Sequence, residues 1–213
     1  MSVACQKQTF ESMIDVLITE ATNSLWEILR HIEYSLRTVT MNKLVFLLLI
    51  IAGTASAAPS IEVGFSPEGS AQKLVLNTIN EAHSSIQMVA YAFQAKDIVA
   101  ALDAAHKRGV RVQVVIDKRR NKGSTSLAAM RDITRHGAEL RIDGHYHIQH
   151  DKMMIVDGST VETGSFNYAK SAEYDNSENV IIIKNMPHIV SQYQKHFASR
   201  WAISEPFEHK NQG

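Results

Sequence analysis

The sequence predicts an α/β domain over residues 58–213, with a mixed β-sheet covered by helices on both faces, and two observations lead to this fold class. Apolar, β-branched runs alternate with helical patterns in the first half of the segment, which is typical of parallel strands joined by helices. The turn signal Asp157-Gly158 then separates two short apolar runs and indicates an antiparallel hairpin. Parallel and antiparallel pairs in one sheet make that sheet mixed.

The individual elements follow from local patterns along the chain. We expect strands at residues 61–65, 86–91, 110–116, 139–142, 153–156, 160–163 and 180–183. We expect helices at residues 70–82, 98–107, 126–135 and 188–201. Gly109 and Gly137 follow the second and third helices, where a glycine commonly ends a helix, and Pro187 precedes the last one.

The composition is that of an ordinary globular protein, with 45% hydrophobic and 21% charged residues. The 22 Lys and Arg balance the 22 Asp and Glu, so no global basic field indicates nucleic acid, and any such preference has to come from a local patch. Cys5 is the single cysteine, which excludes a disulfide within the chain and a cysteine-based zinc site.

A second feature begins at Met41, where a short basic start, an apolar run and the small residues Ala55-Ser56-Ala57 form a secretory signal peptide over residues 41–57. Because a signal peptide begins a chain, residues 1–40 are expected to be a wrongly assigned extension. The alternative is that residues 1–40 are real and that the apolar run anchors the chain in a membrane. The first reading predicts a periplasmic or secreted protein that starts near Ala58, and the second a membrane-anchored one.

Six residues at fixed spacing form the motif that carries chemistry. They are His150, Lys152, Asp157, Gly164, Ser165 and Asn167. On an extended segment His150 and Lys152 point to the same face, and so do Ser165 and Asn167 past the hairpin. The ammonium, hydroxyl and amide groups would surround the non-bridging oxygens of a phosphate, where charge accumulates during substitution at phosphorus. No carboxylate cluster for magnesium accompanies the motif, so these donors would neutralise the charge and no cofactor or metal is expected.

This pattern resembles the HKD motif of the phospholipase D superfamily, specifically over residues 150–167 and more broadly over residues 61–203. The resemblance implies the α-β-α sandwich fold of that superfamily. It also implies that one HKD histidine attacks phosphorus while a second protonates the leaving oxygen. Members with two motifs in one chain fold as two similar halves, but this chain has one motif and no internal repeat. The resemblance therefore implies a homodimer with its active site on the two-fold axis, where His150 of each subunit faces the other.

Within the superfamily the chain looks most like the small secreted Nuc-type bacterial endonucleases. We therefore expect a metal-independent phosphodiesterase that hydrolyses DNA and RNA through a covalent phosphohistidine. The alternative is hydrolysis of phospholipid head groups, since the same phosphate cage serves both substrates. A binding module with a decayed site is disfavoured because all six motif residues are present.

Other residues are predicted to support this chemistry. Glu178 is the candidate that orients the His150 ring, with Asp175 and Glu173 as rivals, and the resemblance implies an acidic residue in this region. Asp157 opens a turn, which favours a structural role. His145, His147 and His150 could form a zinc site, a reading that the HKD pattern makes unnecessary.

A basic run and several aromatic residues are candidates for contact with nucleic acid. Lys118, Arg119, Arg120 and Lys122 follow a predicted strand, where α/β folds place binding loops, and the alternative is a solvated loop. Tyr91, Phe93, Phe166 and Tyr168 could stack on bases, although Phe93 and Phe166 are better explained as core residues.

Overall fold

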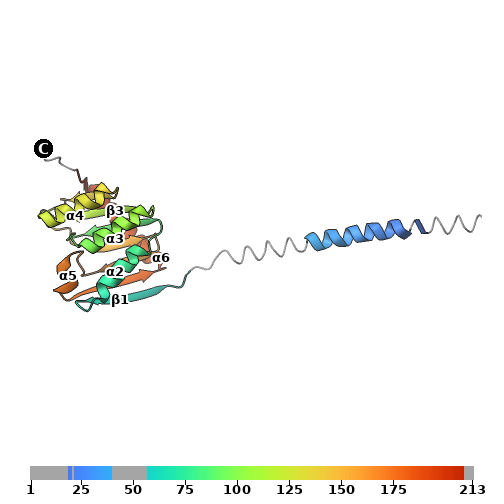
Figure 1. The fold of residues 1–213 in the computed structure, drawn as a ribbon, viewed down its shortest axis with the longest axis horizontal. Coiled ribbons are helices and arrows are strands. Elements are labelled where there is room, and N and C mark those ends of the chain that lie inside the picture. The colour runs from blue at the N-terminus through green and yellow to red at the C-terminus, as the bar shows by residue number, and fades with distance from the viewer. Residues whose placement is uncertain (1–18, 21, 40–56, 209–213) are drawn as a thin grey trace, which may run out of the picture. The chain divides into compact units, whose positions relative to one another are not determined.

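The structure is a computed structural model that describes residues 19–20, 22–39 and 57–208 (Figure 1). The chain divides into two compact units, Met1–Ser56 and Ala57–Gly213. In the first unit residues 22–39 are helical. None of the helices among the described residues has the length and apolar character needed to span a bilayer. Residues 41–56 of the predicted signal peptide lie outside the described residues.

The second unit is built on one eight-stranded mixed sheet, which confirms the predicted fold class. Its strands are β1 (Ser60–Ser66), β2 (Ser85–Ala90), β3 (Arg111–Asp117), β4 (Glu139–Asp143), β5 (Lys152–Val156), β6 (Thr160–Gly164), β7 (Glu178–Lys184) and β8 (Glu205–Pro206). They lie in the order β1-β7-β6-β5-β2-β3-β4-β8. Strands β2, β3 and β4 are parallel, and the remaining pairs are antiparallel.

Helices cover both faces of the sheet. They are α2 (Ser70–Asn80), α3 (Lys96–Lys107), α4 (Ser124–Arg135), α5 (Lys170–Tyr174) and α6 (Pro187–Ile203). Figure 1 shows α2, α3 and α4 side by side across one face, where the larger apolar core forms. A smaller core lies on the opposite face, where Val190 and Phe197 of α6 pack against β2, β3, β5 and β6. The sheet is therefore a central layer with its apolar side chains buried on both sides.

The hairpin predicted at Asp157-Gly158 joins β5 to β6, with Met153 opposite Thr163 and Val156 opposite Thr160. Asp157 and Gly158 both have left-handed backbone conformations, with φ of 52° and 62°. Asp-Gly is a favoured pair for such conformations, so the local sequence sets the turn. The turn fixes the pairing register, and this brings the two halves of the motif onto neighbouring strands.

Candidate active site

The motif begins at the sheet edge where the parallel strands end. Lys152 is the first residue of β5 and pairs with Ala90, the last residue of β2. Strands β3 and β4 end at the same edge, at Asp117 and Asp143. Ligands in α/β sheets bind outside the carboxyl ends of parallel strands. The fold therefore puts His150 and Lys152 at the edge where a substrate is expected.

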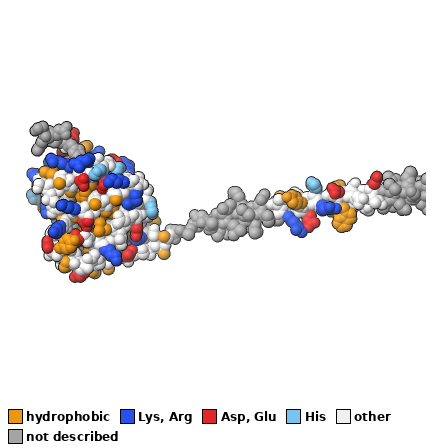
Figure 2. Space-filling model, in the orientation of Figure 1, with side chains coloured by type: hydrophobic (Ala, Val, Ile, Leu, Met, Phe, Trp, Pro, Cys, Tyr) orange, Lys and Arg blue, Asp and Glu red, His pale blue; other side chains and the backbone are white. Residues whose placement is uncertain are grey.

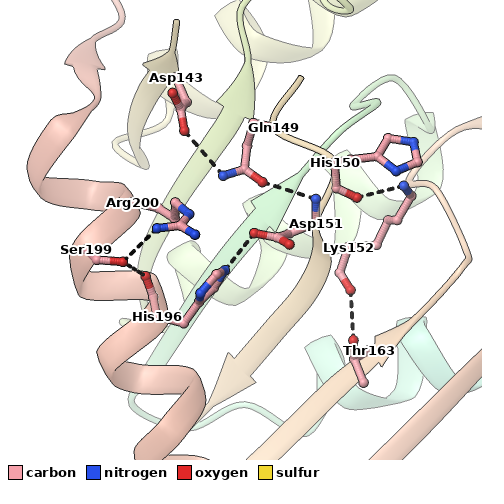
Figure 3. A network of polar contacts seen from close by, with 9 residues as sticks. All are labelled: Asp143, Gln149, His150, Asp151, Lys152, Thr163, His196, Ser199 and Arg200. Carbon is pink, nitrogen blue, oxygen red and sulfur yellow. Dashed lines mark hydrogen bonds and ion pairs between the residues drawn. The ribbon is translucent and has the colours of Figure 1, made fainter. Parts of the chain in front are cut away.

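His150 and Lys152 lie together on one side of the β5 segment, as the spacing predicts (Figure 3). The Lys152 ammonium donates a hydrogen bond of 2.8 Å to the His150 carbonyl oxygen and lies 5.1 Å from the centre of the Tyr91 ring. The Tyr91 ring meets the His150 imidazole edge-on, with centroids 4.5 Å apart. The imidazole itself is exposed and has no hydrogen-bond partner among residues 57–208. An imidazole in this state is available to a substrate.

Burial lowers the pKa of Lys152, while the negative charges of Glu178 and Asp151 act in the opposite direction. Glu178 therefore lies near enough to influence the ammonium. Its carboxylate accepts a hydrogen bond of 2.9 Å from the Asn176 amide, and within residues 57–208 no hydrogen bond joins it to His150. Its role in orienting the His150 ring stays a prediction.

A groove of about 460 Å³ opens beside the motif. Its lining comes from the start of β5, the end of β6 and one side of α6: His150, Asp151, Lys152, Met153, Thr163, Gly164, Gln192, Tyr193 and His196. Asp151 points toward α6, and its Oδ2 atom lies 2.7 Å from Nε2 of His196 (Figure 3). Helix α6 is therefore joined directly to the residue between His150 and Lys152.

Buried polar contacts hold the backbone of this segment. The buried Gln149 side chain accepts a hydrogen bond from the Asp151 N–H at 3.1 Å and donates one to Asp143 at 3.2 Å. The Gln149 N–H donates to the Asp117 carboxylate at 2.9 Å, and the Tyr91 N–H donates to the Asp151 carbonyl at 3.0 Å. His150 thus lies between two residues whose positions are fixed by several hydrogen bonds.

The predicted basic loop lies next to this segment. The other oxygen of Asp117 accepts the N–H groups of Arg119 and Arg120 at 2.9 and 2.6 Å. The Arg119 guanidinium lies 2.6 Å from Nδ1 of His147 and donates to the His147 carbonyl at 3.0 Å. Arg119 thus connects the basic loop to the residues that precede His150. Lys118, Arg119, Arg120 and Lys122 all have exposed side chains.

The second half of the motif is packed against the start of β7. A Cβ atom at Gly164 would lie 2.1 Å from the Asn179 carbonyl oxygen, so only glycine fits there. The Ser165 hydroxyl accepts a hydrogen bond of 3.0 Å from the Asn179 N–H. Asn167 is half-buried, and among the described residues its Oδ1 atom has no hydrogen-bond partner. Their binding of phosphate oxygens stays a prediction.

Asp157 makes structural contacts at the β5–β6 turn. Its carboxylate accepts the N–H groups of His83, Ser84 and Ser85 and the Ser84 hydroxyl, at 2.7–2.9 Å. Burial acts to raise the pKa of Asp157, but the hydrogen bonds outweigh burial and lower it. The residue joins the hairpin to the start of β2, at the end of these strands away from His150.

Comparison with known proteins identifies the family. The family description "Cardiolipin synthase, PLD-like domain" matches residues 75–201. The chain belongs to the phospholipase D superfamily. Phospholipase D of Rickettsia conorii is 34% identical over 138 residues, which are 65% of this chain and 68% of that protein. Mitochondrial cardiolipin hydrolase of Xenopus tropicalis is 31% identical over 138 residues, which are 64% of each chain.

Among solved structures, the phospholipase D family member Nuc of Salmonella typhimurium is 52% identical to this chain. The TM-score is 0.70, and the match covers 71% of this chain and 99% of Nuc. This phospholipase D superfamily member is therefore a phosphodiesterase, and its resemblance to Nuc-type relatives is confirmed.

Of the four aromatic residues considered for base stacking in this phospholipase D family member, Phe93 and Phe166 are confirmed as core residues, and the stacking hypothesis is wrong for Tyr168. Phe93, Phe166 and Tyr168 are each at most 1% exposed, and the Tyr168 hydroxyl donates to Glu162 at 2.6 Å. They face the apolar core because β2 and the segment after β6 meet there, in a bridge between Phe93 and Tyr168. Tyr91 alone of the four lies at the site.

The zinc reading of the three histidines finds no support in this phosphodiesterase. Within residues 57–208 no group of three or more His, Cys, Asp or Glu side chains is arranged to hold a metal ion. His147 contacts Arg119, and the His145 ring packs edge-on against Tyr146.

Several residues that line the groove or hold its backbone were not predicted from the sequence: Asp151, His196, Gln149 and Tyr193. Asp151 lies between His150 and Lys152 in the sequence, and this neighbourhood alone could have predicted that it lies beside them in the structure. The α6 residues carry no such signal, because His196 is 45 residues away from Asp151 along the chain. Only the packing of α6 onto the sheet brings them to the groove.

Proposed function

We propose that this chain is a metal-independent endonuclease that hydrolyses DNA and RNA through a covalent phosphohistidine on His150. The observation that carries the proposal is the exposed His150 imidazole, which has no hydrogen-bond partner among residues 57–208 and lies beside the Lys152 ammonium. The ring supplies a nucleophile, and the ammonium supplies positive charge where the phosphate oxygens become more negative.

The reaction has two steps at phosphorus. A neutral His150 imidazole attacks phosphorus, so that a P–N bond forms as the P–O bond to the leaving oxygen breaks. A second, protonated imidazole donates its proton to that oxygen. In the second step this imidazole takes a proton from water, the water oxygen attacks phosphorus, and the P–N bond breaks. Lys152 neutralises the phosphate in both steps.

The second imidazole is His150 of the partner subunit in a symmetric homodimer. Within the described residues one other imidazole lines the groove, and that ring, His196, is paired with Asp151. A two-fold axis through the phosphate puts identical residues on opposite sides of it, so the same side chain fills both roles. The single motif of the chain supports this arrangement.

Nucleic acid is favoured over phospholipid by the surroundings of the motif. The groove is lined mainly by polar side chains, and the basic loop is joined through Arg119 to the segment that carries His150. Figure 2 shows positive and negative side chains interspersed over the visible face of residues 57–208, so attraction has to act locally. The 52% identity to Nuc supports the same choice. The relatives named phospholipase D and cardiolipin hydrolase make lipid the competing substrate.

The proposed nuclease acts outside the cytoplasm, in the periplasm or after secretion. The support is the signal-peptide pattern of residues 41–57. If that segment is not cleaved, the domain stays attached to a membrane.

The test uses residues 58–213, which make up all but the first residue of the compact unit Ala57–Gly213, and a His150→Asn variant. We expect cleavage of plasmid DNA and RNA in the presence of EDTA, no release of choline from phosphatidylcholine vesicles, and loss of nuclease activity by at least about a thousandfold in the variant. The control is His83→Asn, because His83 is exposed and lies at the opposite end of the sheet. Choline release without DNA cleavage would make the lipid reading correct.

The shared site is tested with heterodimers of wild-type and His150→Asn subunits, purified through two different affinity tags. Each site needs both imidazoles, so these heterodimers should be inactive, and wild-type/His83→Asn heterodimers should be fully active. A covalent protein–DNA adduct should appear on denaturing gels after an alkaline quench, because P–N bonds are lost in acid. Half activity in the first heterodimer would contradict the shared site.

A further inference from the structure

The α6 side of the groove offers side chains that the reaction at phosphorus does not use. Gln192, Tyr193 and His196 lie on consecutive turns of α6 and line the same groove as His150 and Lys152. We call these three residues the α6 wall. The groove thus extends from His150 and Lys152, at the start of β5, to α6, the last helix of the domain.

The charges of the α6 wall suit an anionic ligand. Residues 187–203 contain no Asp or Glu, whereas they include Lys195 and Arg200. Among the described residues that line the groove, Asp151 is the one carboxylate, and its Oδ2 atom lies 2.7 Å from His196. The pairing with an imidazole reduces the repulsion that this carboxylate would exert on a phosphate chain.

Tyr193 gives the α6 wall a flat apolar surface. The side chain is half-buried and packs at the margin of the smaller core, so its position is fixed by the helix and the sheet. Within residues 57–208 its hydroxyl makes no hydrogen bond, although the ring borders the groove. A fixed aromatic ring beside a phosphate site is the arrangement that proteins use to stack single-stranded bases without reading their identity.

We propose that the α6 wall is a subsite for the nucleotide next to the scissile phosphate, with Tyr193 stacking on its base and Gln192 and His196 beside its backbone. This inference rests on the proposed nuclease function. In the symmetric dimer the two-fold axis places one such subsite on each side of the phosphate. The enzyme therefore holds the nucleotides that flank the cut and prefers a strand whose bases are unpaired.

The test compares a short single-stranded oligonucleotide with bis(p-nitrophenyl) phosphate, a minimal diester that has no nucleotide. The measured quantity is the ratio of kcat/KM for the oligonucleotide to kcat/KM for the minimal diester. Tyr193→Phe keeps the ring and should keep the ratio. Tyr193→Leu keeps apolar packing but removes the aromatic face, so the ratio should fall about tenfold, as expected for the loss of one stacked base.

Ser191→Ala provides the matched control, since Ser191 is exposed on the same helix and does not line the groove. Thermal unfolding of each variant separates loss of stacking from loss of folding. An unchanged ratio in Tyr193→Leu, or an equal fall with both substrates, would overturn the subsite. Failure of the nuclease proposal is distinguishable, because the wild-type protein would then not cleave the oligonucleotide.

Discussion

Among the described residues, Glu162 is a carboxylate in unusual surroundings. It is fully buried on β6, its Oε2 atom accepts the Tyr168 hydroxyl at 2.6 Å, and its Oε1 atom has no partner among the described residues. Burial raises the pKa of Glu162 to about 7, although the Tyr168 hydrogen bond acts to lower it. Burial also raises the pKa of Tyr168, with the Glu162 charge adding to the effect. The carboxyl is therefore protonated in the folded protein at mildly acidic pH.

This pKa makes stability depend on pH. The ordinary pKa of a glutamate carboxyl is 4.5, which applies to the unfolded chain, whereas the pKa of Glu162 in the folded protein is about 7. Between these two pH values the folded state therefore holds one proton more than the unfolded state. The free energy of unfolding therefore falls as pH rises through this window, by up to about 1.4 kcal/mol per pH unit. Glu162→Gln removes this slope, which urea unfolding at several pH values would measure.

The matched control for that series is Glu68→Gln, because Glu68 is exposed in the loop after β1. It should leave the slope of the wild-type protein unchanged. If the stability difference between wild type and Glu162→Gln were the same from pH 4.5 to 7, the carboxyl would be ionised in the folded state.

At the scale of elements, the β5–β6 hairpin depends on Asp157, whose carboxylate accepts hydrogen bonds from the two residues before β2 and from the first residue of β2. Asp157→Ala leaves three backbone N–H groups without their acceptor, so we expect a loss of about 2 kcal/mol in the free energy of unfolding. Because the folded pKa of Asp157 is lowered, this contribution is present above the ordinary value of 3.8 and is lost as pH falls below it.

Denaturant unfolding at neutral and acidic pH measures this contribution, with Glu68→Ala as the control. The difference between wild type and Asp157→Ala should shrink in acid. A difference that stays constant down to low pH would mean that the ionised carboxylate is not what holds the turn.

The elements that sequence patterns predicted are those with a strong local signal. Strand β3 lies within one residue of the predicted 110–116 because its β-branched side chains are buried on both faces. Helix α5 was not predicted, because a five-residue helix is too short for a periodic pattern. Strand β8 was not predicted either, because Glu205 and Pro206 form a strand by pairing with β4, a distant part of the chain.

The same distinction applies to the site. His150 and Lys152 share a face because they are two residues apart on an extended segment, and this much is local. The contact of Ser165 with Asn179 depends instead on the pairing of β7 beside β6. The contact of His196 with Asp151 depends on how α6 packs across the sheet. Contacts of this kind are set by tertiary packing and have no signature in a short window of sequence.

For the whole molecule, Lys and Arg balance Asp and Glu in number, so in the proposed nuclease we expect the basic loop to be the main source of attraction for nucleic acid. Replacing Lys118, Arg120 and Lys122 by Gln leaves Arg119 in contact with His147. In a His150→Asn background, which prevents cleavage, these changes should weaken DNA binding and reduce the slope of log affinity against log salt by up to about 3. Fluorescence anisotropy over a salt series measures both quantities.

The control removes the same number of charges elsewhere, with Gln at the exposed positions Lys73, Lys107 and Arg135 of α2, α3 and α4. A loop that is only solvated surface would give the same small effect as this control. The loop contacts phosphates only if its own variant has the flatter salt dependence.

The buried Asp117 carboxylate has a mechanical consequence for the whole domain. One of its oxygens holds the backbone of Arg119 and Arg120, and the other holds the residue before His150. The basic loop and the segment that carries His150 therefore share a single anchor at the end of β3, and in the proposed nuclease these two parts would bind the nucleic acid and attack it. A displacement of the loop would strain the hydrogen bond to the residue before His150, so in the proposed nuclease we expect a nucleic acid that is poorly bound by the loop to lie badly aligned with the nucleophile.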